Sequence, residues 1–193
     1  GLIAFYLAEL NPNVGLDNDT KVFNKDAFYM SVVSHISDGK DFSVIAFEPD
    51  DFDAFTEKYG EVTAKEVMKR IAGFLTELVN AQAVYRLEGY RFAILLGSKD
   101  HSVPEETLTK YYYASHVFAG NPSGNESAED RIVLQALIER FDQPWIVDEE
   151  EYELSSSMCF LTYPEDATRA DEVNDMIEAS LNQARDIGSG TFI

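Results

Sequence analysis

The chain has 193 residues, of which 45% are hydrophobic, and its 15 basic and 35 acidic side chains give a net charge of −20. This length and composition support one sizeable core in a globular domain, and the large negative charge disfavours binding to nucleic acid or to anionic membrane surfaces. A single cysteine, Cys159, excludes an internal disulfide framework and fits a reducing compartment, so we expect a cytoplasmic location.

Residues 1–16 begin with a short apolar segment, which we interpret as an entering helix or linker ahead of one domain over residues 17–193. No apolar run is long enough to cross a bilayer. We therefore expect no direct membrane contact from this segment. Whether a longer parent protein is anchored in a membrane is a separate question that this segment leaves open. The apolar start also suggests a piece of a longer protein.

Strand patterns follow in chain order at residues 42–47, 84–87, 90–96 and 152–161. Between the first two, residues 64–78 place a set of apolar side chains on one helical face, namely Val67, Met68, Ile71, Phe74, Leu75 and Leu78. Strands separated by helical patterns predict an α/β layered fold in which helices cover one face of the sheet.

Residues 83–96 bring two of these strand patterns together at the pair Glu88-Gly89. A two-residue connection with Gly in the second place predicts a tight primed turn, because a positive φ costs glycine little. We therefore expect a β-hairpin with charge at its tip.

The sequence changes character between Gly97 and Asp130, and we interpret this stretch as a variable insert. Three consecutive tyrosines at 111–113 are either a partner patch or a packed face with one exposed ring, and a Gly/Asn/Ser/Pro loop follows at 120–127. Further on, the acidic run at 148–151 predicts a solvated hairpin turn after the strand pattern at 145–147.

Nucleophilic and metal-binding side chains are few. Cys159 lies in a strand pattern and is expected to be a small buried side chain. The three histidines show neither a triad-like setting nor a paired metal-ligand spacing, so we expect them at the surface or in loops; they are His35, His101 and His116.

The hairpin sequence resembles a known signature. The run Arg86-Leu87-Glu88-Gly89-Tyr90-Arg91-Phe92 is similar to the signature hairpin of the GGDEF family, the diguanylate cyclases, which reads Arg-x-Gly-Gly-Asp/Glu-Glu-Phe. Segments at 17–28, 42–60, 153–167 and 175–188 resemble further family motifs in the same order, so the resemblance runs from about Asp17 to Gly190. It implies a nucleotidyl cyclase-like α+β fold with a central, mainly antiparallel sheet covered by helices.

The resemblance also implies a metal site that this chain has altered. In the family, carboxylates of the hairpin tip and of the first central strand help to hold divalent metal while one GTP attacks another. The signature positions are taken here by Glu88, Gly89, Tyr90, Arg91 and Phe92. A Tyr is neutral near pH 7 and an Arg has no acceptor, so neither would ligate Mg²⁺. Glu48 takes the place of the first metal-binding Asp and is the weak metal candidate.

The nucleotide-binding candidates that the resemblance carries to this chain are Asn24, Asp50, Thr56, Glu57 and Arg185. Thr56 and Glu57 replace an Asn-Asp pair that reads guanine in the family, which puts guanine selectivity in doubt. Arg185 takes the place of a phosphate-contacting Lys. The family's feedback site for its product falls on Val79 and Gln82 and is absent.

We therefore predict a catalytically inactive or severely impaired GGDEF-like domain that serves as a regulatory or dimer-forming module in bacterial cyclic di-GMP signalling and requires no cofactor. Residues 131–145 resemble segments found where a GGDEF domain precedes an EAL phosphodiesterase domain. The expected partners are other domains of the parent protein, an EAL domain among them, and a second copy of the chain.

Two alternatives stay open. A GTP-binding domain without turnover could use Arg91 beside Glu48 as a built-in cation in place of Mg²⁺, with Arg185 nearby. The simpler interpretation of Glu48 and Arg91 is an ion pair that closes the site where the family binds metal. A weak diguanylate cyclase could hold Mg²⁺ with Glu48, Asp50 and Asp51, although acids at such a place more often cap a helix.

Overall fold

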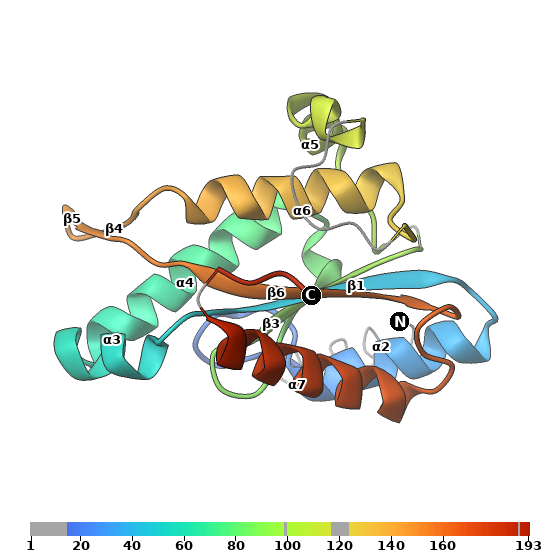
Figure 1. The fold of residues 1–193 in the computed structure, drawn as a ribbon, viewed down its shortest axis with the longest axis horizontal. Helices are drawn as coiled ribbons and strands as arrows, with labels where there is room; N and C mark the ends of the chain where they lie inside the picture. Colours follow the sequence, from blue (N-terminus) through green and yellow to red (C-terminus); the bar gives the residue numbers. More distant parts are fainter. Residues whose placement is uncertain (1–14, 99, 117–123, 189) are drawn as a thin grey trace.

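The computed structural model describes residues 15–98, 100–116, 124–188 and 190–193. At its centre is a four-stranded sheet in the order β2-β3-β1-β6, in which all neighbouring strands are antiparallel (Figure 1). Its strands are β1 (Phe42–Pro49), β2 (Val84–Arg86), β3 (Phe92–Leu96) and β6 (Ser156–Tyr163). The expected α+β class with a central antiparallel sheet is confirmed.

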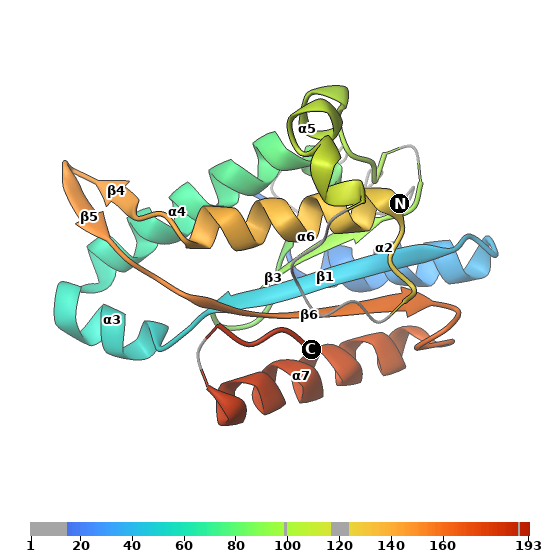
Figure 2. The same ribbon diagram turned by 45° about the horizontal axis from the view of Figure 1, so that its top comes forward.

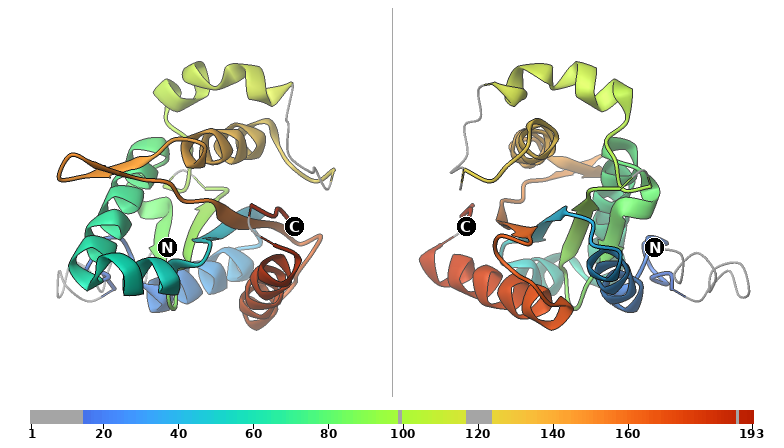
Figure 3. Two further views of the ribbon diagram at one scale, coloured as in Figure 1. Left: turned by 60° about the vertical axis from the view of Figure 1, so that its left-hand side comes forward. Right: turned by 90° about the vertical axis from the view of Figure 1, so that its right-hand side faces the viewer.

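Helices cover both faces of this sheet (Figures 1 and 3). The helices α2 (Lys25–Ser37) and α7 (Ala170–Ile187) pack on one face, and α4 (Glu61–Leu78) and α6 (Ala128–Phe141) pack on the other. The expectation that helices cover one face is wrong. Successive side chains of a strand point to opposite faces, and on β1 both sets are apolar: Val44 and Ala46 join the core under α2 and α7, while Ile45 and Phe47 join the core under α4 and α6.

The α4 helix presents the predicted apolar face, because Val67, Ile71 and Leu75 are fully buried, while Phe74 is only partly buried. It begins earlier than predicted, at Glu61, directly after the short helix α3 (Phe52–Tyr59) and Gly60. Gly60 has a φ of 90°, a conformation that favours glycine. The chain therefore turns sharply between the two helices.

The register of the sheet brings the hairpin tip to one end of β1. Phe47 on β1 pairs with Phe92, the first residue of β3, and the next residue, Glu48, pairs with Ser157 on β6. The rings of Phe47 and Phe92 stack with their centroids 5.6 Å apart. Glu48 and the β2–β3 connection therefore lie at the same end of the sheet.

The stretch from Gly97 to Asp130 is partly helical. It contains α5 (Glu105–Lys110), the 3₁₀ turn η2 (Tyr112–Ser115) and the start of α6. Figure 2 shows α5 and η2 as an outlying layer over α6. Ser127 caps α6 by accepting from the Asp130 amide at 3.1 Å, while the Asp130 carboxylate accepts from the Ser127 amide at 2.9 Å. Part of the predicted loop at 120–127 lies outside the described residues, and its described end, 124–127, is neither helix nor strand.

The predicted acidic turn is confirmed as the connection of a separate hairpin formed by β4 (Trp145–Val147) and β5 (Glu150–Tyr152). Asp148 and Glu149 join these strands, and both have positive φ, 50° and 68°, as a two-residue primed turn requires. The single strand expected over 152–161 is replaced by β5 and β6, with a break between them.

The final residues run along the open edge of β6. The Met158 amide donates to the Thr191 carbonyl at 2.8 Å, and the Phe160 amide donates to the Ile193 carbonyl at 3.0 Å. At the other end of the chain, the predicted entering segment lies outside the described residues up to position 14. Within the described part, no helix is both long enough and apolar enough to cross a membrane.

Candidate functional site

The β2–β3 hairpin is present, but its connection is longer than predicted. The ladder ends at the pair Arg86–Phe92, and residues 87–91 form the connection. The Leu87 amide donates to the Arg91 carbonyl at 2.9 Å, and the Arg91 amide donates to the Glu88 carbonyl at 3.3 Å. Gly89 adopts the predicted positive φ, 65°, whereas Glu88 does not. The prediction of a two-residue primed turn centred on Glu88-Gly89 is therefore wrong. The observed turn begins one residue later and is centred on Gly89-Tyr90.

Glu48 lies next to the end of β1 and is only 8% exposed. Its Oε2 accepts a hydrogen bond from Nε of Arg91 at 3.2 Å, and its Oε1 accepts one from Nη2 of Arg185 at 2.8 Å. Nη2 of Arg91 also donates to Oδ1 of Asn182 at 2.9 Å. We call these four residues the Glu48 cluster. It joins the central strand, the hairpin tip and α7.

Cationic donors engage both oxygens of the Glu48 carboxylate. The hydrogen bond and the negative charge of Glu48 raise the pKa of Arg185, which stays protonated. The Arg91 side chain is 17% exposed and that of Arg185 is 62% exposed. The Arg185 contact is the shorter of the two. Solvent screens it more strongly, however, so we expect the Arg91 contact to contribute more to stability.

This arrangement does not fit a divalent metal. Mg²⁺ binds carboxylate oxygens, and each oxygen of Glu48 already accepts from a guanidinium group whose positive charge would repel a cation there. Tyr90 offers a phenol in place of a carboxylate, and its ring packs against that of Phe52 with a centroid distance of 4.7 Å. In the parts of the chain that the structure describes, no three His, Cys, Asp or Glu side chains are arranged to hold a metal ion.

A cavity of about 310 Å³ lies beside Glu48, and its polar and charged lining residues include Glu48, Asp50, Asp51, Asp53, Tyr90 and Arg185. Asp50 is already committed to structural contacts: Oδ2 accepts from Oγ of Ser155 and from the Gly190 amide, each at 2.7 Å, and Oδ1 accepts from Oγ of Ser157. Asp50 therefore ties β6 and the C-terminal segment to the end of β1.

The acids after β1 also meet the start of α3. Asp51 stands at the N-cap position with a φ of 53°, but its side chain makes no capping hydrogen bond. The predicted cap is thus right in position and wrong in its contact. Asp53, in the first turn, carries a charge that favours the positive end of the helix dipole.

A smaller second pocket, of about 190 Å³, contains Thr56, and its other lining residues include Asp19, Phe52, Glu61, Lys65, Met68, Arg86 and Tyr90. Oγ1 of Thr56 donates to the Phe52 carbonyl at 2.8 Å, so its hydroxyl proton already has an acceptor within α3. Phe52 and Tyr90 line both pockets and form the wall between them.

The remaining candidates lie elsewhere. Asn24 caps α2 by accepting from the Ala27 amide at 3.0 Å, and Glu57 is exposed on α3; neither lines either pocket. Glu88 is also exposed and accepts from Nζ of Lys25 at 2.8 Å. The structure therefore brings Glu48, Asp50 and Arg185 together around one cavity, and the nucleotide-binding roles stay predictions.

Sequence reasoning missed Asn182. This residue precedes Arg185 by three positions on α7, and side chains at that spacing share a helix face. The helical spacing could therefore have placed Asn182 near Arg185, but its contact with Arg91 depends on how α7 packs against the sheet.

The cysteine is where the sequence predicts it, and two of the histidines are not. Cys159 is 2% exposed on β6, and burial raises the pKa of its thiol to about 12, which keeps it neutral. His35 and His101 are 5% and 3% exposed, and their rings lie 4.9 Å apart. The expectation of surface histidines is wrong for these two, because α2 turns His35 toward the sheet and Tyr85 and Ser98 provide hydrogen-bond partners for His101. His116 is exposed.

The site lies where a charged hairpin meets the end of a central strand in an antiparallel sheet. The sequence profile of the family described as "Diguanylate cyclase, GGDEF domain" matches residues 14–111, just over half of the chain. The chain belongs to the GGDEF family.

Known proteins agree with this assignment. The bifunctional diguanylate cyclase/cyclic di-GMP phosphodiesterase MucR of Pseudomonas aeruginosa is 23% identical over 181 residues, a match that covers 91% of this chain and 23% of MucR. The chain therefore spans about a quarter of the length of that relative.

Solved structures show the same fold. A sensory box/GGDEF family protein from Caulobacter crescentus has a TM-score of 0.65 at 19% identity, covering 91% of this chain and all of that one. The GGDEF domain of FimX from Pseudomonas aeruginosa has a TM-score of 0.66 at 13% identity, covering 92% of this chain and 98% of that one.

Proposed function

We propose that this GGDEF domain does not make cyclic di-GMP and instead acts as a regulatory module of a longer cyclic di-GMP signalling protein. The observation that carries this proposal is the Glu48 cluster: the carboxylate at the metal position is held by Arg91 and Arg185, with donor distances of 3.2 and 2.8 Å. A metal ion would have to displace two cations from a largely buried acid.

The chemistry of nucleotidyl transfer supports the same conclusion. Such transfer depends on metal ions and positioned charge that neutralise the phosphates. In this chain the hairpin supplies Tyr90 and Arg91 in place of acidic side chains. Arg91 cannot accept from water or bind a cation, so the hairpin tip offers no carboxylate ligand at these positions.

A role within a longer protein is supported by the family relationship. The relative MucR is named for two activities, and this chain corresponds to about a quarter of its length. We propose that an EAL domain follows, because residues 131–145 resemble segments found ahead of EAL domains. Most of that segment forms α6, whose residues Val133, Leu134 and Leu137 are fully buried. The residues that carry the resemblance therefore include residues of the domain core.

A GTP-binding domain without turnover is the second candidate. It is favoured by the cavity of about 310 Å³ beside Glu48 and by Arg185, whose side chain is 62% exposed there. It is opposed by the charge of the same wall, where Glu48, Asp50, Asp51 and Asp53 face one arginine. Without metal, a triphosphate would meet net repulsion.

The deciding experiment combines a product assay with calorimetry. The chain is incubated with GTP and Mg²⁺ or Mn²⁺ beside an active diguanylate cyclase domain, and products are separated by chromatography. We expect no cyclic di-GMP from this chain. Formation of the product, abolished by Glu48→Ala, would overturn the proposal. Titration with GTP in EDTA tests the second candidate, and heat that is lost in Arg185→Ala would favour it.

A further inference from the structure

Another concave surface lies between the last turn of α4 and the helix α5. The cavity measures about 650 Å³, and its lining residues are Phe74, Glu77, Leu78, Glu105, Glu106, Thr107, Thr109, Lys110 and Tyr111. We call it the α4–α5 groove. None of these residues lines the two pockets near Glu48.

The floor of the groove is apolar. Leu78 is 4% exposed in the main core, and Phe74 and Tyr111 pack against that core while staying partly exposed. Oγ1 of the buried Thr107 donates to the Leu78 carbonyl at 2.8 Å. This bond joins α5 to the end of α4 and so links the two helices that line the groove.

The rim of the groove is acidic. Glu77, Glu105 and Glu106 are exposed and form no ion pair with any residue that the structure describes. Among the described residues that line the groove, Lys110 alone is basic, and its Nζ lies 5.4 Å from the centroid of the Tyr111 ring. Three carboxylates face one ammonium group in a chain with a net charge of −20, so the groove attracts cations.

We propose that the α4–α5 groove docks a basic amphipathic segment of a partner protein. Apolar side chains of the segment would contact Phe74, Leu78 and Tyr111, and its Lys or Arg side chains would pair with the rim. The inference goes beyond the proposed function, because the groove shares no residue with the Glu48 cluster. The same rim repels an anionic cyclic dinucleotide, and a second copy of the chain carries the same charge of −20.

The test uses the whole chain and a labelled helical peptide of about 16 residues with leucines on one face and lysines on the other. Binding is followed by fluorescence anisotropy at physiological salt. In the groove variant Glu77→Lys/Glu105→Lys/Glu106→Lys, we expect the Kd to rise about tenfold or more. Circular dichroism checks that this variant is folded.

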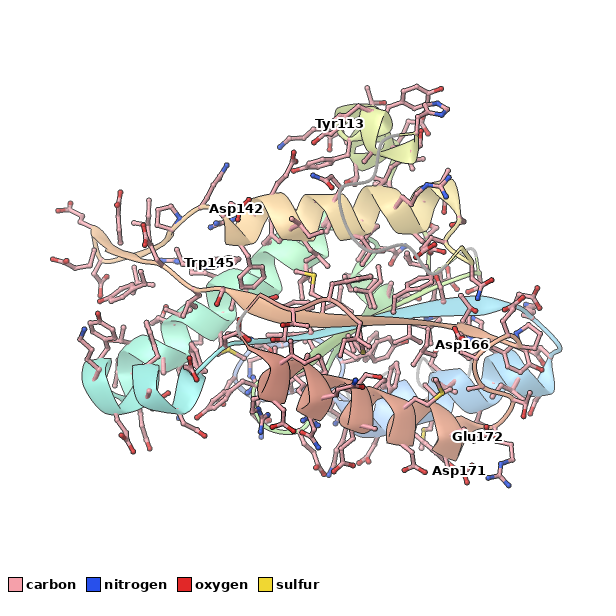
Figure 4. All side chains as sticks on the ribbon, viewed as in Figure 1. Tyr113, Asp142, Trp145, Asp166, Asp171 and Glu172 are labelled. Atoms are coloured by element: carbon pink, nitrogen blue, oxygen red, sulfur yellow. The ribbon has the colours of Figure 1, made fainter. Side chains whose placement is uncertain are left out.

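A matched control changes the net charge equally. The variant Glu151→Lys/Asp175→Lys/Glu178→Lys alters exposed acids on β5 and α7. Figure 4 shows the start of α7, marked by Asp171 and Glu172, on the opposite side of the sheet from Tyr113 in the outlying layer. We expect the control to change the Kd by less than about threefold. Equal weakening by both variants would mean unspecific attraction and would overturn the proposal.

Two further measurements complete the test. A peptide whose leucines are replaced by glutamine should bind at least about tenfold more weakly, and unchanged binding would contradict an apolar floor contact. Light scattering across a concentration series should show no dimer that depends on the groove. A dimer lost in the groove variant would assign this surface to a second copy of the chain and overturn the proposal.

Discussion

The guanidinium of Arg91 holds three elements together. It donates to Glu48 on β1 and to Asn182 on α7 from the tip of the β2–β3 hairpin. Glu48 is 8% exposed, and a carboxylate at such a site is costly to leave without its partners. Arg185 adds a second donor from a more exposed position. Arg91 therefore stabilises the fold at the point where the family resemblance places a metal ligand.

The two arginines should contribute unequally to stability. We expect Arg91→Met to lower the free energy of unfolding by about 2 kcal/mol, because a buried carboxylate loses its better-shielded donor. Arg185→Met, at a side chain that is 62% exposed, should cost less than about 1 kcal/mol. Urea denaturation measures both values. Equal costs would contradict the difference in screening, and a double change with Glu48→Gln should be less than additive with Arg91→Met.

The buried histidines predict a pH dependence. Burial lowers the pKa of His101 from 6.5 to about 3, and it also lowers the pKa of His35. Because the unfolded chain takes up a proton near pH 6.5 and the folded chain does not, stability falls as the pH drops from about 6.5 toward 3.

For His101 alone, we expect a loss of about 2 kcal/mol between pH 7 and pH 5. Denaturation at the two pH values measures it. His101→Gln should flatten this dependence. The matched change His116→Gln, at an exposed ring, should leave it as it is. A steep dependence that survives in His101→Gln would rule out this origin.

At the scale of the elements, close approach of backbones limits which residues fit. Gly97 follows β3 with a φ of 154°, and a Cβ there would lie 2.6 Å from the Asp41 carbonyl oxygen and 2.9 Å from Cα of Phe42. Both contacts are to backbone at the start of β1, a strand that is held on both sides by β3 and β6. Neither strand can shift without disturbing the sheet.

Two glycine substitutions test this point. Gly97→Ala should lower the free energy of unfolding by about 3 kcal/mol, because the added methyl group meets backbone. Gly73→Ala is the matched control: Gly73 is an exposed residue of α4, and an added Cβ meets no atom within 4 Å. It should raise stability by about 0.5–1 kcal/mol through helix propensity. Thermal denaturation compares the two, and a neutral Gly97→Ala would show that the strands can yield.

At the scale of the whole molecule, the Glu48 cluster and the chain's charge act in opposite directions on a metal ion. A net charge of −20 attracts divalent cations in general, whereas the two guanidinium groups that donate to Glu48 oppose a cation at its oxygens. Any stabilisation by metal should therefore be weak and sensitive to salt in the natural chain.

Restoring acids to the hairpin should change this behaviour. We expect Tyr90→Asp/Arg91→Glu to gain a Mn²⁺-dependent rise in Tm of about 3 °C or more, since a ligand that binds only the folded state stabilises it. The natural chain should show a smaller shift that disappears in added salt. Scanning calorimetry measures both. A specific Mn²⁺ shift in the natural chain would contradict closure of the site by arginine.

Local pattern was sufficient for much of the fold. Alternation and helical spacing placed the β1, β2 and β4 strands and the buried face of α4, because side-chain direction repeats every two residues in a strand and every 3.6 in a helix. The order of the motifs led to the GGDEF family. The same local rules misplaced the turn at Glu88-Gly89, since its position depends on where the β2–β3 ladder stops.

The chain's sequence by itself determined that Tyr90 and Arg91 stand at the two acidic positions of the signature hairpin, because packing cannot change which residue type occupies a position. Only the tertiary structure decided that Arg91 and Arg185 meet on Glu48, that Asn182 supports them and that His35 and His101 are buried. These contacts join residues far apart in the chain, and they depend on how α2 and α7 pack on the sheet, which no local period encodes.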